Sequence, residues 1–349
     1  MNKEYLLETQ GLISKRSFNG CTKEAPVVCI WCCPDVLSTT LAEEEADRSL
    51  ILGTDLGCSN PPPRKYDRHS SWLNVPKIWR EEMERRVKHM ETVCRDTTHS
   101  VDGSSARTGF PPMLYVDDRH RLIMCSMPKV GCTNGKRLLY ALTGNVDMKS
   151  FHNFGSGKKV VSYKRFLPRL SQYSPFGAKL RLETYLKVII VRHPLERLVS
   201  AYRGKLEGKG HPITGEAIYI AKRFETNPTP GMLTGKEGVS FQAFIDYLNS
   251  LDPNKDYNDH WESYIRLCDP CQIHYDVIAR LESQGTDLNM MLKLIGMDDM
   301  LTYPEGDLPA SSSAVWKKYF TEISRSDIRK IWQHYELDAR LFNFTLDWY

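Results

Sequence analysis

The feature that most constrains the fold of this 349-residue chain is an apolar segment followed by a basic loop and a helix, a pattern found twice. The first copy is "RLIMCSMPKVGCTNGKRLLYALTG", residues 121–144, and the second is "YLKVIIVRHPLERLVSAYRGKL", residues 185–206. In the second copy Val188–Val191 is a continuous apolar block, which is typical of a parallel strand covered on both faces. Strands that alternate with helices predict an α/β fold with a parallel sheet.

Further segments extend this alternation along the chain. We predict helices at residues 241–251, 287–297 and 324–342, and a strand leading into a loop at residues 275–283. Residues 1–105 are expected to form a variable, partly disordered N-terminal region, and residues 106–349 the main folded domain. Within the N-terminal region we expect one charged helix at residues 75–93. Its apolar residues recur at helical spacing: Ile78, Met83, Val87 and Met90.

The overall charge of the chain is mild. Lys plus Arg total 47 and Asp plus Glu total 43, a net charge of +4. Nucleic-acid-binding domains are usually more basic, so we expect no nucleic-acid partner, although a local basic cleft for an anion is compatible with this balance. No apolar run reaches the ~18 residues that a membrane span requires. The nearest candidate, residues 25–42, is interrupted by Pro34 and Asp35.

The chain contains ten cysteines, too few for a disulfide scaffold of this length. Cys268 and Cys271 form a "CDPC" pair, and Cys29 and Cys32 form the other such pair, far away in the sequence. A redox site would need a strand before the pair and a helix after it, and zinc would need a second pair nearby. We therefore predict structural disulfides and no metal site. The sequon at Asn343 fits a secretory-pathway protein.

The loop after the first strand has the composition of an anion site. Lys129 follows the strand, Gly131 permits a tight turn, and Thr133 and Asn134 stand at the helix start. Backbone N–H groups and the positive end of a helix attract an anion in this geometry. An ordinary capped helix beside a solvated lysine remains the structural alternative. A triphosphate loop is disfavoured, because the glycine spacing is one residue short and Arg137 replaces the magnesium-binding hydroxyl.

The second loop offers a different set of anion ligands. Arg192 follows the apolar block, and Ser200 lies eight residues later, about two helical turns along. The guanidinium fork of an arginine suits a phosphate, and Ser200 adds a hydroxyl. Arg197 and Arg203 add positive charge, so a basic surface helix is the alternative.

These motifs carry a family resemblance. "PKVGCTNGKR" resembles the 5′-phosphosulfate loop of sulfotransferases, and "RHPLERLVSAYRGK" resembles their 3′-phosphate motif. The stretch at residues 259–283 and the ending "YELDARLFNF" are similar to one branch. That branch is the Golgi carbohydrate sulfotransferases of family 2, which includes the chondroitin and dermatan 4-O-sulfotransferases and the HNK-1 sulfotransferase. The likeness covers about residues 114–349.

The resemblance implies a P-loop-like three-layer sandwich, with a central parallel sheet flanked by helices. It implies 3′-phosphoadenosine 5′-phosphosulfate as donor, no required metal, and a glycosaminoglycan or glycoprotein glycan as acceptor. The preferred acceptor position is the 4-O of N-acetylgalactosamine in chondroitin/dermatan-type glycans. The family also implies a Golgi membrane protein with a lumenal catalytic domain, although no anchor is visible in this sequence.

The resemblance assigns the donor site residue by residue. Arg192 and Ser200 would hold the 3′-phosphate. Gly135 departs from the family, which usually carries Trp there, and this departure puts donor affinity in doubt. The 5′ end would be held by Pro128, Lys129, Val130, Gly131, Cys132, Thr133 and Asn134.

Sulfuryl transfer needs a group that stabilises charge on the leaving phosphate and a base that takes the hydroxyl proton. Lys129 is the candidate for the first role, and His260, in "NDHWESY", is the first candidate for the second. Glu207 and His193 are alternative bases, and His260 as a structural hydrogen-bonder remains open. A P-loop nucleotide kinase and a catalytically weak glycan-binding relative are the alternative functions.

Overall fold

The computed structural model describes residues 68–98, 109–144, 167–208, 215–252, 258–303 and 315–346. The chain separates into two compact units, residues 1–42 and residues 43–349, and all described residues belong to the second. The pair Cys29 and Cys32 and the apolar segment at residues 25–42 therefore lie outside the described residues. The predicted domain boundary near residue 105 stays a prediction.

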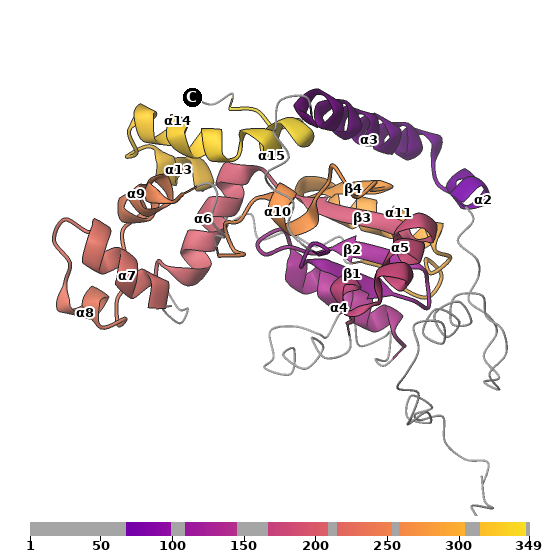
Figure 1. Cartoon of the computed structure of the whole chain (residues 1–349), viewed down its shortest axis with the longest axis horizontal. Coiled ribbons are helices and arrows are strands. Elements are labelled where there is room, and N and C mark those ends of the chain that lie inside the picture. Colours follow the sequence, from indigo (N-terminus) through magenta and orange to yellow (C-terminus); the bar gives the residue numbers. More distant parts are fainter. Residues whose placement is uncertain are drawn as a thin grey trace, which may run out of the picture. The chain divides into compact units, whose positions relative to one another are not determined.

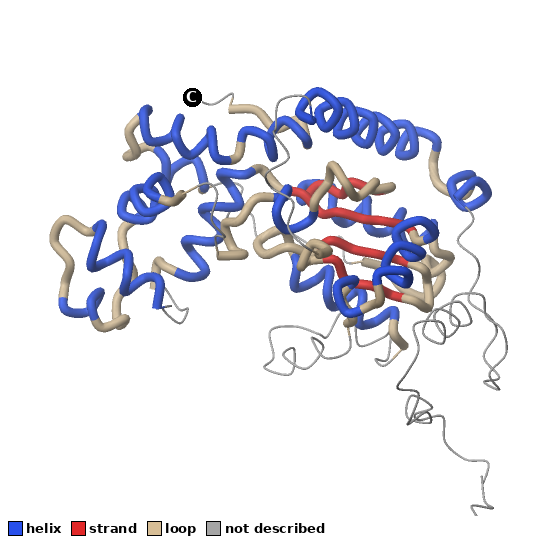
Figure 2. The backbone as a smooth tube through the Cα atoms, viewed as in Figure 1, coloured by secondary structure: helices blue, strands red, loops and turns tan. Residues whose placement is uncertain are grey.

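The domain has the predicted α/β class, but its sheet is mixed rather than wholly parallel. Its strands are β1 (Leu114–Asp117), β2 (Leu122–Cys125), β3 (Leu186–Val191) and β4 (Val277–Arg280), paired in the order β1-β2-β3-β4 (Figure 2). The predicted parallel arrangement is confirmed for β2, β3 and β4. β1 was not predicted, and it runs antiparallel to β2. The connection between them is too short for a parallel crossover.

The helices fall close to their predicted positions. The helix expected after the first basic loop forms α4, and the helix predicted at residues 241–251 forms α9. The helix predicted at residues 324–342 is divided at Tyr335 into α14 and α15. The helices are α2 (Arg68–Leu73), α3 (Lys77–Thr98), α4 (Cys132–Leu142), α5 (Pro175–Thr184), α6 (Pro194–Lys205), α7 (Gly215–Phe224), α8 (Pro230–Leu233), α9 (Phe241–Ser250), α10 (Tyr264–Cys268), α11 (Gln284–Leu294), α13 (Trp316–Phe320), α14 (Arg325–His334) and α15 (Glu336–Leu341).

The predicted charged helix is present as α3 and packs on β4 and α15. Met83 and Met90 are buried, as their spacing predicted, but Ile78 is 79% exposed. Trp79 is the buried residue in that turn, and its Nε1 donates to Asp287 at 2.9 Å. The apolar spacing found the helix but assigned one residue to the wrong face.

The domain contains two hydrophobic cores. The first lies around the sheet and includes α4, α11 and α3. The second is built by the helices α6, α7, α9, α13 and α14, which gather in Figure 1. α6 begins directly after the loop that follows β3 and contributes to the second core, so this loop lies where the two cores adjoin.

The prediction of structural disulfides is confirmed for four of the described cysteines, whereas Cys132 is free. Cys268 is bonded to Cys125 at the end of β2, and Cys271 is bonded to Cys94 in α3. The two cysteines of "CDPC" therefore have separate partners and form neither a redox dithiol nor half of a zinc site. Within the described ranges, no three His, Cys, Asp or Glu side chains cluster as metal ligands.

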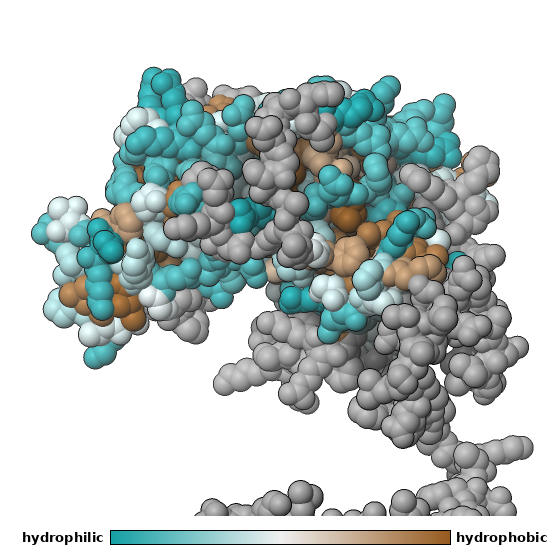
Figure 3. Space-filling model, in the orientation of Figure 1, coloured by the Kyte–Doolittle hydropathy of each residue, from teal (hydrophilic) through white to brown (hydrophobic). Residues whose placement is uncertain are grey.

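The face of the domain in Figure 3 is largely hydrophilic, with apolar patches between polar ones. Tyr219 in α7 and Leu233 in α8 are among the exposed large apolar residues. Within the part of the chain that the structure describes, no helix combines the length and apolar character of a bilayer span.

Candidate active site

The loop between β2 and α4 is held in an unusual backbone conformation. Lys129 has φ 72° and Gly131 has φ 80°, so both occupy the left-handed region. For a lysine this conformation is uncommon and costs energy, and such residues concentrate at functional sites. Gly131 is the N-cap of α4 and supplies no side-chain cap to the N–H groups of its first turn. These N–H groups are suited to an anionic ligand.

Two arginines of the second basic segment hold this loop by hydrogen bonds to its backbone. Arg192 Nη1 donates to the Lys129 carbonyl at 2.9 Å, and Arg197 Nε donates to the Pro128 carbonyl at 3.2 Å. Arg192 also pairs with Glu196 at 2.8 Å. Both guanidinium groups are almost fully buried. Because successive carbonyls are occupied in this way, the strained turn at Lys129 is fixed from α6 and its neighbouring loop.

Arg197 additionally reaches the segment that carries His260. Its Nη2 donates to the Asp259 carbonyl at 3.2 Å, so one buried side chain connects the Lys129 loop with the residue before His260. The sequence indicated that Arg197 adds positive charge, with a basic surface helix as the alternative; because Arg197 is buried, the surface alternative does not hold for this residue. The helical spacing from Arg192 carries no signal that distinguishes an inward-facing arginine from a solvated one.

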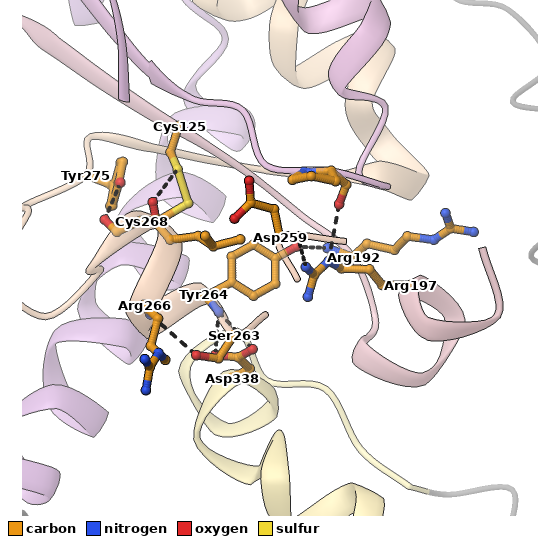
Figure 4. The surroundings of a disulfide bond; sticks show 12 residues. Cys125, Arg192, Arg197, Asp259, Ser263, Tyr264, Arg266, Cys268, Tyr275 and Asp338 are labelled. Atoms are coloured by element: carbon orange, nitrogen blue, oxygen red, sulfur yellow. Dashed lines mark hydrogen bonds between the residues drawn. A yellow bond between two sulfur atoms is a disulfide. The ribbon is translucent and has the colours of Figure 1, made fainter. Parts of the chain in front are cut away.

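Tyr264 supports both arginines from the other side, as Figure 4 shows. Its hydroxyl accepts the backbone N–H of Arg192 at 2.9 Å, and the Arg197 guanidinium lies 5.6 Å from its ring centroid. The backbone N–H of Tyr264 donates to both carboxylate oxygens of Asp338, at 2.9 and 3.0 Å. The disulfide between Cys125 and Cys268 joins the same region to β2. Both arginines therefore contact a buried tyrosine whose helix, α10, is linked to β2 by a disulfide.

His260 is oriented by an asparagine and a glutamate. Asn258 Nδ2 donates to Glu216 Oε2 at 2.7 Å, and Asn258 Oδ1 lies 2.8 Å from His260 Nδ1. Because the Asn258 nitrogen is used by the carboxylate, its oxygen must face the imidazole, and an amide oxygen only accepts. His260 Nδ1 therefore carries the proton, and Nε2 keeps a lone pair. This is the tautomer that a general base requires at Nε2.

The site is strongly positive. Burial and the cations Lys205, Arg192 and Arg197 lower the pKa of Lys129 to about 8. Burial, together with Lys205, Lys129 and Arg197, lowers the pKa of His260 to about 4, so the imidazole is neutral near pH 7. Lys205 and Arg197 lower the pKa of both groups. An arriving anion offsets this field and raises both pKa values.

The remaining predicted ligands of the first loop differ in exposure. Val130 is fully buried, so only its backbone can face a ligand, whereas Thr133 is exposed and Pro128, Cys132 and Asn134 are half-buried. Ser200 is half-buried on α6, two turns from Arg192. A methyl group on Gly204 would lie 2.5 Å from Lys129 Nζ, so this glycine leaves space for the lysine amine.

The alternative bases are engaged elsewhere. Glu207 accepts from the Tyr319 hydroxyl at 2.8 Å, and His193 Nε2 lies 3.0 Å from the Thr345 carbonyl, with its ring 4.8 Å from that of Trp316. Trp261, next to His260, is fully buried against Phe244, with ring centroids 5.4 Å apart, so its ring packs in the core.

Gly135 lies on the buried side of α4. A Cβ at this position would meet Ile190 Cδ1 at 3.3 Å, and Met124 Sδ and Ser126 Oγ at 3.5 Å. These atoms belong to the sheet and its edge, so a side chain at position 135 would point between α4 and the sheet. The residue at position 135 therefore affects the packing between α4 and the sheet.

Comparison with known proteins decides the family. The family model described as "Sulfotransferase family" matches residues 112–345. The chain belongs to the sulfotransferase family. This match spans β1 to the segment after α15 and includes every residue of the site. The family resemblance read from the two loops, and with it the enzyme class, is confirmed.

Several curated relatives are carbohydrate sulfotransferases. Carbohydrate sulfotransferase 8 of Mus musculus is 32% identical over 301 residues, covering 82% of this chain and 67% of that protein. Carbohydrate sulfotransferase 9 of Homo sapiens is 33% identical, covering 78% of this chain and 62% of that protein. Carbohydrate sulfotransferase 11 of Danio rerio is 35% identical, with 76% of each chain covered. The chain thus spans about two thirds of the length of the first two relatives. No solved structure matches it significantly.

Proposed function

We propose that this chain is a carbohydrate sulfotransferase that uses 3′-phosphoadenosine 5′-phosphosulfate as donor. The observation that carries the proposal is the Arg197 bridge, which joins the loops of Lys129 and His260 in one cationic site. The names of the relatives support a carbohydrate acceptor. Within that class we propose the 4-O position of N-acetylgalactosamine in chondroitin/dermatan-type glycans.

In this proposal the N–H groups at the start of α4, together with Lys129, bind the 5′-phosphosulfate. His260 Nε2 takes the proton of the acceptor hydroxyl while the sugar oxygen bonds to sulfur. The bond from sulfur to the phosphate oxygen breaks in the same displacement, and Lys129 stabilises the negative charge that develops on that oxygen. Asn258 and Glu216 keep the imidazole in the required tautomer.

The pKa values fit this order of events. In the empty site, a His260 pKa of about 4 makes the imidazole a weak base, and a Lys129 pKa of about 8 means that the amine loses its charge as the pH rises through 8. The negative charges of the donor raise both values. Donor binding therefore strengthens the base and secures the charge of the lysine before the acceptor reacts.

Arg192 and Ser200 remain the proposed ligands of the 3′-phosphate. Arg192 is paired with Glu196 and with the Lys129 carbonyl, so it would serve two purposes, positioning the loop and meeting the phosphate. Its loss should therefore affect both donor affinity and the geometry of Lys129.

The setting proposed for the enzyme is the Golgi lumen, with membrane attachment as in the family. Two disulfides in the described part of the chain fit an oxidising compartment. Asn343 of the sequon is exposed, as a glycosylation site must be. No observation favours a nucleotide kinase, since Arg137 donates to Asn134 Oδ1 at 3.0 Å where a magnesium-binding hydroxyl would be needed.

A transfer assay with sulfur-labelled donor tests the proposal. Chondroitin, dermatan and desulfated chondroitin serve as acceptors, and the labelled disaccharides are identified after digestion. Lys129→Ala and Arg192→Ala should each cost at least about tenfold in rate or donor affinity, or about 1.4 kcal/mol. Full activity of either correctly folded variant would remove that residue's role. Label on no acceptor, despite donor binding, would favour the glycan-binding alternative.

A further inference from the structure

Gln284 is the first residue of α11 and carries a deeply buried carboxamide. The residue is 2% exposed, and neither Oε1 nor Nε2 has a hydrogen-bond partner among the described residues. Buried polar groups in native proteins are almost always paired, because an unpaired group loses its hydration without compensation. A buried amide with both ends unpaired requires a partner that the described residues do not supply, such as a water molecule, an ion or a bound ligand.

The position of this carboxamide identifies the partner's site. A Cβ on Gly131 would lie 2.6 Å from Gln284 Oε1 and 2.8 Å from Nε2, so the amide lies against the N-cap residue of α4. The two residues are 153 positions apart in the numbering. They meet because the parallel strands β2 and β4, with β3 between them, end at the same edge of the sheet, where α4 and α11 begin. Gly131 thus has two reasons to lack a side chain, its positive φ and this close approach.

The chemistry of the amide suits the edge of an anion site. Nε2 carries two N–H donors for the oxygens of a phosphate or sulfate, and Oε1 can accept an N–H of the loop. A neutral donor binds an anion without adding a further positive charge to a site that already holds Lys129, Arg192 and Arg197. Hydrogen bonds to an ionised acceptor are also stronger than neutral ones.

We propose that the Gln284 carboxamide is an additional ligand of the donor's 5′-phosphosulfate end, beside the N-terminus of α4. This inference rests on the proposed function, since it takes the anion at that helix to be the 5′ end of the nucleotide. It adds the first residue of α11 to a site that otherwise consists of residues from the two loop motifs and the His260 segment. The residue has no motif around it, which is why its sequence position gives no signal.

Calorimetric titration of the full chain tests the inference with two nucleotides. Adenosine 3′,5′-bisphosphate carries a 5′ anion, and adenosine 3′-monophosphate lacks it. Gln284→Met, which keeps the length of the side chain but removes the amide, should weaken the bisphosphate about tenfold, or about 1.4 kcal/mol. The same variant should bind the 3′-monophosphate as the wild type does. Gln284→Glu should weaken the bisphosphate further, because a carboxylate repels the 5′ anion.

A matched substitution and a stability measurement separate ligand binding from folding. Gln242→Met in α9, where the amide pairs with Asp246, should leave both affinities unchanged. Since removal of an unpaired buried amide costs the empty fold nothing, Gln284→Met should keep or raise the thermal midpoint without nucleotide. Equal weakening of both nucleotides, or a lower midpoint with unchanged affinities, would overturn the inference.

The test also distinguishes this inference from the proposed function. If the wild type binds the bisphosphate and Lys129→Ala weakens it, but Gln284→Met binds like the wild type, only the role of Gln284 is refuted. If the wild type binds neither nucleotide, the proposed donor is refuted and the inference falls with it.

Discussion

Replacement of Arg197 by methionine is the most informative perturbation of the site. Methionine retains an unbranched apolar stem but removes the two hydrogen bonds, each 3.2 Å long, to the Pro128 and Asp259 carbonyls. Hydrogen bonds to charged groups contribute roughly 1.5–3 kcal/mol each, and the long distances place these two at the lower end. We therefore expect a loss of about 3 kcal/mol in unfolding free energy, or roughly 6–12 °C in thermal midpoint.

The effect on turnover should exceed the effect on stability. Without Arg197 the loops of Lys129 and His260 lose their common anchor, and a displacement near 1 Å costs about 100-fold in rate. The pH dependence should change in a defined direction. Arg197 is one of the cations that lower the pKa of His260, so its removal raises that pKa from about 4 toward the ordinary value. The imidazole is then protonated at a higher pH, and the acidic limb of kcat/KM moves upward.

The assay combines thermal unfolding with a pH profile of labelled sulfate transfer. Arg203→Met is the matched control, because Arg203 lies in the same helix, is one-third exposed and is 3.9 Å from Glu207. A surface pair of this kind contributes about 0–1 kcal/mol. If Arg197→Met and Arg203→Met behave alike in midpoint, rate and acidic limb, the bridging role of Arg197 is refuted.

Two further predictions follow from the supports of the site. Asn258→Ala removes the acceptor of His260 Nδ1, so kcat should fall roughly 10- to 100-fold while nucleotide affinity stays constant; an equal loss in both quantities would contradict a role in orienting the base. Cys268→Ser opens the link to Cys125 across 143 residues and should cost about 2–5 kcal/mol in unfolding free energy, measured by denaturant titration; a midpoint equal to the wild type would show that the bond adds no stability.

Much of the fold could be predicted because its signals are local. The apolar block of β3, the stop at Pro128 after β2 and the glycine before α4 each determine structure within a few residues. β1 was missed because its pairing depends on a short turn in which Asp117 accepts the N–H groups of Arg119 and His120. The outward position of Ile78 was missed because periodicity finds a helix but does not say which neighbour will cover each turn.

The sequence by itself determined the alternation of strands and helices, the two basic loops and the family to which they belong. Lys129 and His260 could be named from motifs, because their residue type and neighbours carry the signal. Only the tertiary structure decided that Arg197 binds the carbonyls of Pro128 and Asp259, which are 69 and 62 positions away in the sequence. The same holds for the hydrogen bond from Asn258 to Glu216, 42 positions away. The sequence does not show whether a charged or polar side chain faces water or a buried partner. The partner comes within hydrogen-bond distance only when distant segments pack together.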